Sequence, residues 1–242
     1  MKSTVYGEYL VQLTRYPNIF PVNAYLVRED DGFTLVDTGL SGGEEAFLAA
    51  AREWGGEIHR IALTHAHGDH TGSLDALHDA LPEAELLVPA REASFLRGDL
   101  DLTPEEQRLG GLKGWWKAAK TAPTRELSPG DRVGSLVVVA APGHTPGQVA
   151  YLDARDGTLI AGDAFQTRAG IAVSGVIRPL FPFPAMGTWS LSTALESARS
   201  LRSLSPSRLA VGHGPVLEDP LEAMDHAIEA AERKTESKQH AA

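Results

Sequence analysis

The sequence contains no cysteine. This absence excludes disulfides, thiolate metal sites and cysteine nucleophiles, so histidines and carboxylates must hold any bound metal. No apolar run approaches membrane-spanning length, and residues 1–16 lack the apolar core of a signal peptide. We therefore expect a cytoplasmic protein with no membrane partner.

Basic residues are also scarce relative to acidic ones. The chain has 22 lysines and arginines against 32 aspartates and glutamates, a net charge of -10. Proteins that neutralise phosphate backbones carry the opposite excess, so nucleic acid is not expected as a partner. The 242 residues suffice for one large core, and we predict a single domain over residues 1–242.

The apolar pattern predicts a mixed α/β fold. It begins with three antiparallel strands and a helix, and then strands and helices alternate. A strand over 58–64, a helix stopped by Pro82 and a strand over 85–88 form a predicted βαβ unit, whose functional site should lie at the carboxyl end of the first strand. The three opening strands are predicted at 9–13, 22–28 and 33–36, and the helix at 43–54.

The second half continues with a strand at 136–140 and a hairpin over 149–161 that turns at Asp156-Gly157. A helix around 191–201, a strand at 208–211 and a final helix after Asp219-Pro220 complete the pattern, with a polar tail from about Lys234.

Two intervals break the alternation. Residues 91–127 contain the capping-box pattern Thr103-Pro104-Glu105-Glu106 followed by several glycines, which predicts an inserted helical cap. Residues 164–188 are rich in glycine, proline and aromatic residues, which is typical of a long functional loop.

The most informative stretch is Thr64-His65-Ala66-His67-Gly68-Asp69-His70. On an extended backbone the side chains of His65 and His67 point the same way and can bind one ion together. Gly68 permits a sharp bend that turns Asp69 and His70 toward a second position. The spacing therefore suits two metal ions better than one.

Further ligand candidates follow other predicted strands. Of nine histidines, five lie just after strands in glycine-rich or turn contexts, and Asp163 follows another strand. With Asp69 these groups supply seven nitrogen and oxygen ligands, which two divalent ions need. The five histidines are His65, His67, His70, His144 and His213, whereas His59, His78, His226 and His240 lie elsewhere.

This pattern resembles the metallo-β-lactamase superfamily, whose His-x-His-x-Asp-His motif is matched by residues 65–70 and whose later elements are matched by His144, Asp163 and His213. The resemblance implies a four-layer αββα sandwich of two mixed sheets flanked by helices. It assigns His65, His67 and His144 to the first ion. It assigns Asp69, His70 and His213 to the second, with Asp163 bridging them. An aspartate at the position of Asp37 is implied to orient a metal-bound histidine.

The implied cofactors are two divalent metal ions, with zinc as the first expectation and iron or manganese as alternatives. Two such ions activate water and polarise a carbonyl or phosphoryl oxygen. We therefore predict hydrolysis of a small-molecule thioester, ester or lactone by a hydroxide bridging the ions, with Asp163 and Asp69 as catalytic groups. Asp69 would orient the hydroxide and pass a proton.

Residue identities narrow the subclass. Flavodiiron-type members carry glutamate in place of His67, and one class of β-lactamases needs a thiolate. The segment Gly143-His144-Thr145-Pro146-Gly147 looks most like glyoxalase II, but only 29 residues follow His213 for its glutathione-binding domain. Lactonases and small-ester hydrolases remain alternatives. So do a mononuclear-iron persulfide dioxygenase and a non-catalytic metal- or ligand-binding protein.

The predicted substrate is an apolar or anionic small molecule. Arg168 or Arg178 would meet an anionic group, and aromatic and apolar residues of the cap and the loop would line the mouth. Ordinary loop packing is the competing interpretation, and the oligomeric state stays open, with a homodimer as one option. The mouth candidates are Trp115, Trp116, Phe165, Phe181, Phe183, Met186 and Trp189.

Overall fold

The computed structural model describes residues 1–239, so His240 lies outside the described residues. The chain forms two compact units. The first unit contains residues 1–99 and 115–138, and the second contains residues 100–114 together with the chain from residue 139 onward.

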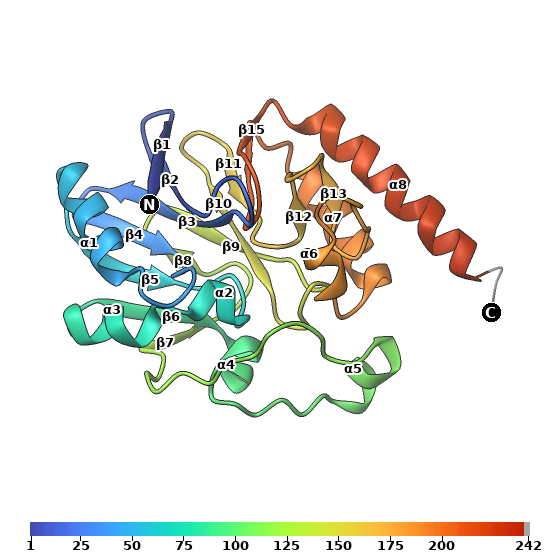
Figure 1. The fold of residues 1–242 in the computed structure, drawn as a ribbon, viewed down its shortest axis with the longest axis horizontal. Helices are drawn as coiled ribbons and strands as arrows, with labels where there is room; N and C mark the ends of the chain where they lie inside the picture. The colour runs from blue at the N-terminus through green and yellow to red at the C-terminus, as the bar shows by residue number, and fades with distance from the viewer. Residues whose placement is uncertain (240–242) are drawn as a thin grey trace. The chain divides into compact units, whose positions relative to one another are not determined.

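The first unit is built on a seven-stranded mixed sheet with the strands in chain order (Figure 1). Neighbouring strands are antiparallel from β1 to β4 and parallel from β4 to β7. The strands are β1 (Lys2–Tyr6), β2 (Leu10–Arg15), β3 (Val22–Glu29), β4 (Gly32–Val36), β5 (Ile58–Ala62), β6 (Glu85–Pro89) and β7 (Arg125–Leu127).

The central strands of this sheet consist mainly of buried residues. In β3 the six residues from Val22 to Val27 are buried, and in β4 so are the four from Phe33 to Val36, as expected for strands covered on both faces. Helix α1 (Glu44–Glu53) buries Phe47 and Ala50, while α3 (Leu74–Ala80) buries Leu74 and Leu77. The predicted βαβ unit is confirmed, because β5 and β6 pair in parallel.

The interval 91–127 has a mixed structure. Helix α4 (Ala90–Leu96) buries Phe95 and Leu96 in the first unit, and β7 adds the last strand of its sheet. The helical part in the second unit is α5 (Pro104–Leu109). Its capping box is confirmed, because Glu106 N donates to Thr103 Oγ1 and Thr103 N donates to the Glu106 carboxylate.

The second sheet is mixed and six-stranded, with the order β15-β14-β11-β10-β9-β8. The predicted hairpin of β10 and β11 is antiparallel, whereas β11 and β14 are parallel neighbours. The strands are β8 (Arg132–Val133), β9 (Leu136–Ala140), β10 (Val149–Asp153), β11 (Thr158–Ile160), β14 (Arg208–Ala210) and β15 (Leu217–Glu218).

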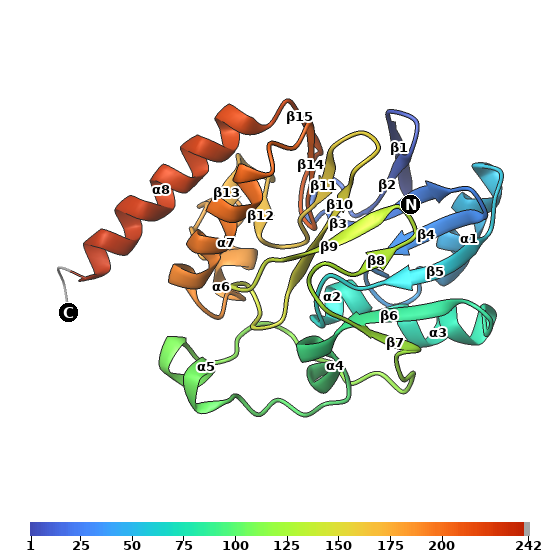
Figure 2. The same ribbon diagram turned by 180° about the vertical axis from the view of Figure 1, so that it is seen from behind.

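Helices α7 (Leu191–Ser203) and α8 (Leu221–Gln239) run along one another in the second unit (Figure 2). The inward side chains of α7 and α8, such as Leu201 and Met224, share one hydrophobic core with Leu159 and Leu209 of the sheet. Helix α8 continues to Gln239, beyond Lys234, where a polar tail was predicted. Its polar outer face explains the difference, because an amphipathic helix can be hydrophilic over most of its end. The prediction of two mixed sheets flanked by helices is confirmed.

The interval 164–188 is more regular than the predicted loop. It contains the short pair β12 (Phe165–Gln166) and β13 (Ala172–Val173) and the single turn α6 (Phe183–Met186). Among residues 1–239, no helix has the length and apolar character required to cross a membrane.

Candidate metal centre

The histidine-rich turn follows β5 in the first unit. Residues 63–67 connect the strand to α2 (Gly68–Thr71), a single helical turn that carries Asp69 and His70. The ring of His65 lies 4.9 Å from that of His67 and 4.1 Å from that of His70, between ring centres. All three rings are buried. The local structure therefore gathers the predicted ligands of this motif within one turn.

Asp37 supports this turn from the end of β4. Its Oδ1 accepts a hydrogen bond from Thr64 N, and its Oδ2 accepts from Thr64 Oγ1 and contacts His70 Nδ1, all at 2.8 Å. Its backbone has a φ of 62°, an unfavourable region for a residue with a side chain. Strain of this kind persists where surrounding contacts over-determine the conformation, as these three contacts do.

The hydrogen-bond network assigns the ring protons of two histidines. Thr64 gives its only hydroxyl proton to Asp37, so its oxygen accepts from His65 Nδ1, 3.0 Å away. The Asp37 carboxylate likewise accepts from His70 Nδ1. A neutral imidazole protonated at Nδ1 carries its lone pair on Nε2. Both rings are therefore in the tautomer that binds metal through Nε2.

Glu92 is a buried carboxylate that the sequence interpretation missed. It is 0% exposed in α4, and its Oε2 accepts from Ala66 N at 2.8 Å. Ala66 lies between His65 and His67, so this bond fixes the backbone between these two predicted ligands. The available signal was a lone acidic residue beside the apolar Ala93, Phe95 and Leu96.

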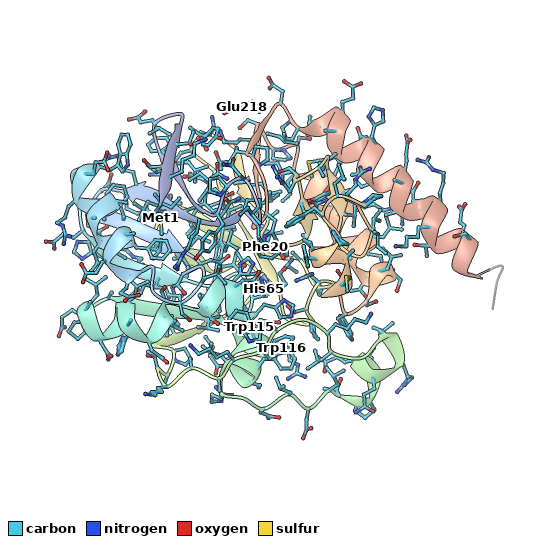
Figure 3. The ribbon with its side chains drawn as sticks, viewed as in Figure 1. Met1, Phe20, His65, Trp115, Trp116 and Glu218 are labelled. Carbon is cyan, nitrogen blue, oxygen red and sulfur yellow. The ribbon has the colours of Figure 1, made fainter. Side chains whose placement is uncertain are left out.

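Two tryptophans cover the same turn (Figure 3). The Trp116 ring packs edge-on against His67, with 4.4 Å between ring centres, and also contacts Phe95. Trp115 O accepts from Gly68 N at 2.7 Å, and a Cβ at Gly68 would lie 2.8 Å from the Trp115 ring. Glycine at 68 is therefore required for this packing. Trp115 is 51% exposed, which leaves much of its ring accessible to a ligand.

In the second unit, Asp163 and His213 come together because of strand order. They follow β11 and β14, which are parallel neighbours, so their carboxyl ends meet at one edge of the sheet. A backbone bond from Gly212 N to Gly162 O, 2.9 Å long, joins the two connections. His213 Nε2 lies 3.2 Å from Asp163 Oδ2.

His144 reaches the same carboxylate from the segment after β9. Its Nε2 lies 3.4 Å from Asp163 Oδ2, so one carboxylate oxygen faces two histidine nitrogens. The approach depends on Gly143, whose φ is +140° and whose added Cβ would lie 2.3 Å from the Ala194 backbone. His144, Asp163 and His213 are all 2–3% exposed. We call these three residues the strand-end triad.

A chain of hydroxyls assigns the His144 proton. Thr188 Oγ1 donates to Pro184 O at 2.7 Å, so it accepts from Ser174 Oγ at 2.8 Å. Ser174 Oγ then accepts from His144 Nδ1 at 3.0 Å. His144 is therefore also protonated at Nδ1, with its lone pair on Nε2 toward Asp163.

The predicted substrate residues lie in different environments. Phe165 is fully buried in the hydrophobic core of the second unit, where it serves packing. Phe181 is buried between the rings of Phe183 and His213. Phe183 and Met186 are 54% and 63% exposed.

The two arginines are held at different points of the same unit. Arg178 donates its Nε proton to Ile171 O at 3.0 Å. Arg168 N donates to His213 O at 3.2 Å, which places its backbone beside the triad. Of the two arginines, Arg168 is therefore the one whose backbone is hydrogen-bonded to a predicted metal ligand, His213.

The donor set fits divalent metal. The turn and the triad contain only imidazole nitrogens and carboxylate oxygens, which suit zinc, iron and manganese. The hydrogen bonds of His65, His70 and His144 hold each ring in the metal-binding tautomer, as outer contacts of metal ligands usually do. Each group therefore has donor atoms that suit a divalent ion.

The chain belongs to the metallo-β-lactamase superfamily, because the model of that family matches residues 17–213. Members of this superfamily are generally metallo-hydrolases.

Particular relatives support this assignment. The chain is 46% identical over 222 residues to the uncharacterized protein YobT of Bacillus subtilis (strain 168), covering 92% of this chain and 95% of YobT. It is 27% identical to the probable metallo-hydrolase YflN of the same organism, covering 79% and 80%. The solved structure of TTHA1623 in a di-iron-bound form matches with a TM-score of 0.64 and 29% identity, covering 88% of this chain and 96% of that chain.

Proposed function

We propose that this protein is a binuclear metal-dependent hydrolase that cleaves a thioester, ester or lactone of a small molecule. The histidine-rich turn and the strand-end triad would together hold the two ions. In this proposal His65, His67 and His144 bind the first ion, and Asp69, His70 and His213 bind the second. Asp163 bridges them.

The arrangement of Asp163 carries the proposal. Its Oδ2 lies 3.4 Å from Nε2 of His144 and 3.2 Å from Nε2 of His213, the histidines that the family pattern assigns to different ions. A carboxylate that faces ligands of both ions is positioned to bridge them. Burial of the Asp163 carboxylate favours this interpretation, since a bound cation would offset the cost of burying its charge.

The ions, when bound, would activate water and polarise the scissile carbonyl. The protein's own residues would fix this chemistry in place. Asp37 and Thr64 would hold His70 and His65 in their ligand tautomers, and Ser174 would do the same for His144. Asp69, which is only partly buried, would accept a proton from the attacking water and pass it on.

The metal identity belongs to the proposal as well. Imidazole and carboxylate ligands suit zinc, which remains our first expectation. The related TTHA1623 binds two irons, so iron is a serious alternative for this chain. Metal analysis decides between them.

The substrate would approach the histidine-rich turn over an aromatic surface. Trp116 packs edge-on against His67, and the half-exposed Trp115 lies beside Gly68. Aromatic faces next to a metal centre favour a substrate with an apolar portion. We therefore propose a small acyl or lactone substrate.

A substrate panel tests the hydrolase proposal. Thioesters, lactones, aryl esters, phosphodiesters and β-lactams should be compared at matched metal content. We expect turnover of at least one of the first three classes, and its loss in the Asp163→Ala variant. Oxygen uptake with a persulfide by protein containing one iron would instead establish the dioxygenase alternative. Inactivity on all classes with both ions bound would favour a binding protein.

A further inference from the structure

One pocket lies entirely within the second unit, and none of the predicted metal ligands lines it. Its volume is about 480 Å³, within the range of small-molecule sites. Its walls come from several places in the sequence. The end of α5 and the following segment supply Leu109 and Lys113, the start of α7 supplies Leu191 and Ser192, and α8 supplies Thr235.

The pocket is held open by specific contacts. The buried Trp189 indole Nε1 donates to Glu106 O at 3.2 Å and to Gly110 O at 3.0 Å, which fastens the α5 wall to the chain before α7. Lys113 Nζ donates to Thr188 O at 3.0 Å and closes the same wall. Segments distant in sequence are therefore fixed around this space by hydrogen bonds.

The charge of the walls selects the ligand. All the residues that line the pocket belong to the described part of the chain. Lys113 is the only charged residue among them, so the lining has no acidic side chain. Ser190 and Ser192 add hydroxyl-bearing side chains to the lining, while Leu109 and Leu191 add apolar surface. This is a cationic, hydroxyl-rich pocket in a chain whose net charge is -10.

The pocket also lies on a defined side of His144. Thr188 lines it, and Thr188 Oγ1 lies 3.3 Å from His144 Nδ1. The opposite nitrogen, Nε2, faces Asp163. An occupant of the pocket would therefore be separated from Asp163 by the His144 ring and would not contact the reacting groups.

We propose that this pocket is a binding site for a compact organic carboxylate with an apolar body, distinct from the metal face. The carboxylate pairs with Lys113 and the hydroxyls of Ser190 and Ser192, and the apolar body packs on Leu109 and Leu191. Charge-assisted bonds of a lysine to a carboxylate supply the selectivity over neutral molecules. This site does not depend on the hydrolase proposal.

The test uses hexanoate as the probe and hexanamide as its neutral counterpart, with the protein as purified. Binding is followed in proton–nitrogen NMR spectra through the indole N–H signals of the four tryptophans, assigned by single Trp→Phe variants. Trp189 forms part of the pocket wall, whereas Trp116 packs edge-on against His67. We expect saturable hexanoate-dependent shifts of the Trp189 indole, and weaker binding of hexanamide.

Two variants from different walls test the charge argument. Lys113→Gln removes the cation, and Ser192→Asp adds a repelling carboxylate at an early helix position where aspartate favours folding. Each should weaken hexanoate binding by about tenfold or more, in line with loss of a charge-assisted bond. The matched control Lys120→Gln should leave binding unchanged, and Ser192→Asn, which adds no charge, should weaken binding less than Ser192→Asp. Equal affinity of wild type and Lys113→Gln, shifts confined to Trp116, or no saturable binding would overturn the proposal.

Discussion

Asp37 Oδ2 lies 2.8 Å from Nδ1 of His70, and the same oxygen accepts the hydroxyl proton of Thr64. One carboxylate thereby determines the proton positions of two predicted metal ligands, because Thr64 in turn accepts from His65. We therefore expect Asp37 to influence metal binding through its neighbours.

We expect Asp37→Asn to weaken metal binding by about 10- to 100-fold, the usual cost of removing a contact that orients a metal ligand. The charge that favours the Nδ1–H tautomer of His70 is lost, while the side-chain volume is kept. Competition with a chromogenic chelator measures the affinity. If the affinity were unchanged and circular dichroism showed an intact fold, Asp37 would only stabilise the backbone of the histidine-rich turn.

A second prediction concerns the hydroxyl groups of Ser174 and Thr188, which form a hydrogen-bonded chain with His144. Thr188→Val removes the acceptor of the Ser174 hydroxyl, so Ser174 can turn its proton toward His144 and disturb the Nδ1–H tautomer. Metal affinity should fall by about tenfold, and the nitrogen shifts of the His144 ring should change in NMR spectra. Thr188→Ser keeps the hydroxyl and is the matched control. If Val and Ser behaved alike, the hydroxyl chain would have no role in fixing this ring.

Glu92 should contribute to stability as well as to site geometry. Glu92→Ala leaves Ala66 N without its carboxylate acceptor in a buried position, and the free energy of unfolding should fall by about 1–3 kcal/mol. Glu92→Gln keeps an oxygen acceptor and should cost less. Urea denaturation of the three proteins compares them directly. An equal loss in both variants would mean that the negative charge, and not the hydrogen bond, is what stabilises the turn.

Asp75 gives an expected pH dependence. Burial raises the pKa of its carboxyl, but hydrogen bonds from Thr121 N, Thr121 Oγ1 and Lys120 N outweigh it and hold the pKa below the ordinary value of 3.8. A lowered folded-state pKa stabilises the protein above about pH 4, and this contribution is lost as pH falls through the folded pKa. The stability difference between wild type and Asp75→Asn should therefore shrink in acid. Denaturation curves at pH 6 and pH 3 measure it, and a difference independent of pH would contradict the assignment.

The local sequence pattern reveals the candidate metal ligands but not the residues that support them. Candidates such as His65 and Asp163 follow apolar strands, and a strand followed by a polar turn is visible in a local pattern. Glu92 contacts Ala66 across 26 positions, and Thr188 contacts His144 across 44, so both depend on long-range packing that no local pattern contains.

Long-range packing also explains where the observed fold differs from the predicted one. The interval 91–127 was predicted as one helical cap, but Phe95 and Leu96 of α4 are buried and β7 joins the first sheet. Whether Phe165 lies at a surface or in a core likewise depends on the packing of α7 and α8, which aromatic composition alone does not reveal.

The most direct test of the central claim is the metal content of wild type and Asp163→Ala, measured by mass spectrometry on protein purified without added metal. We expect about two ions per wild-type chain, as in two-metal hydrolases, and one or fewer in the variant, with most hydrolysis lost. Two ions retained in Asp163→Ala, or a single ion in the active wild type, would contradict a bridging carboxylate at position 163.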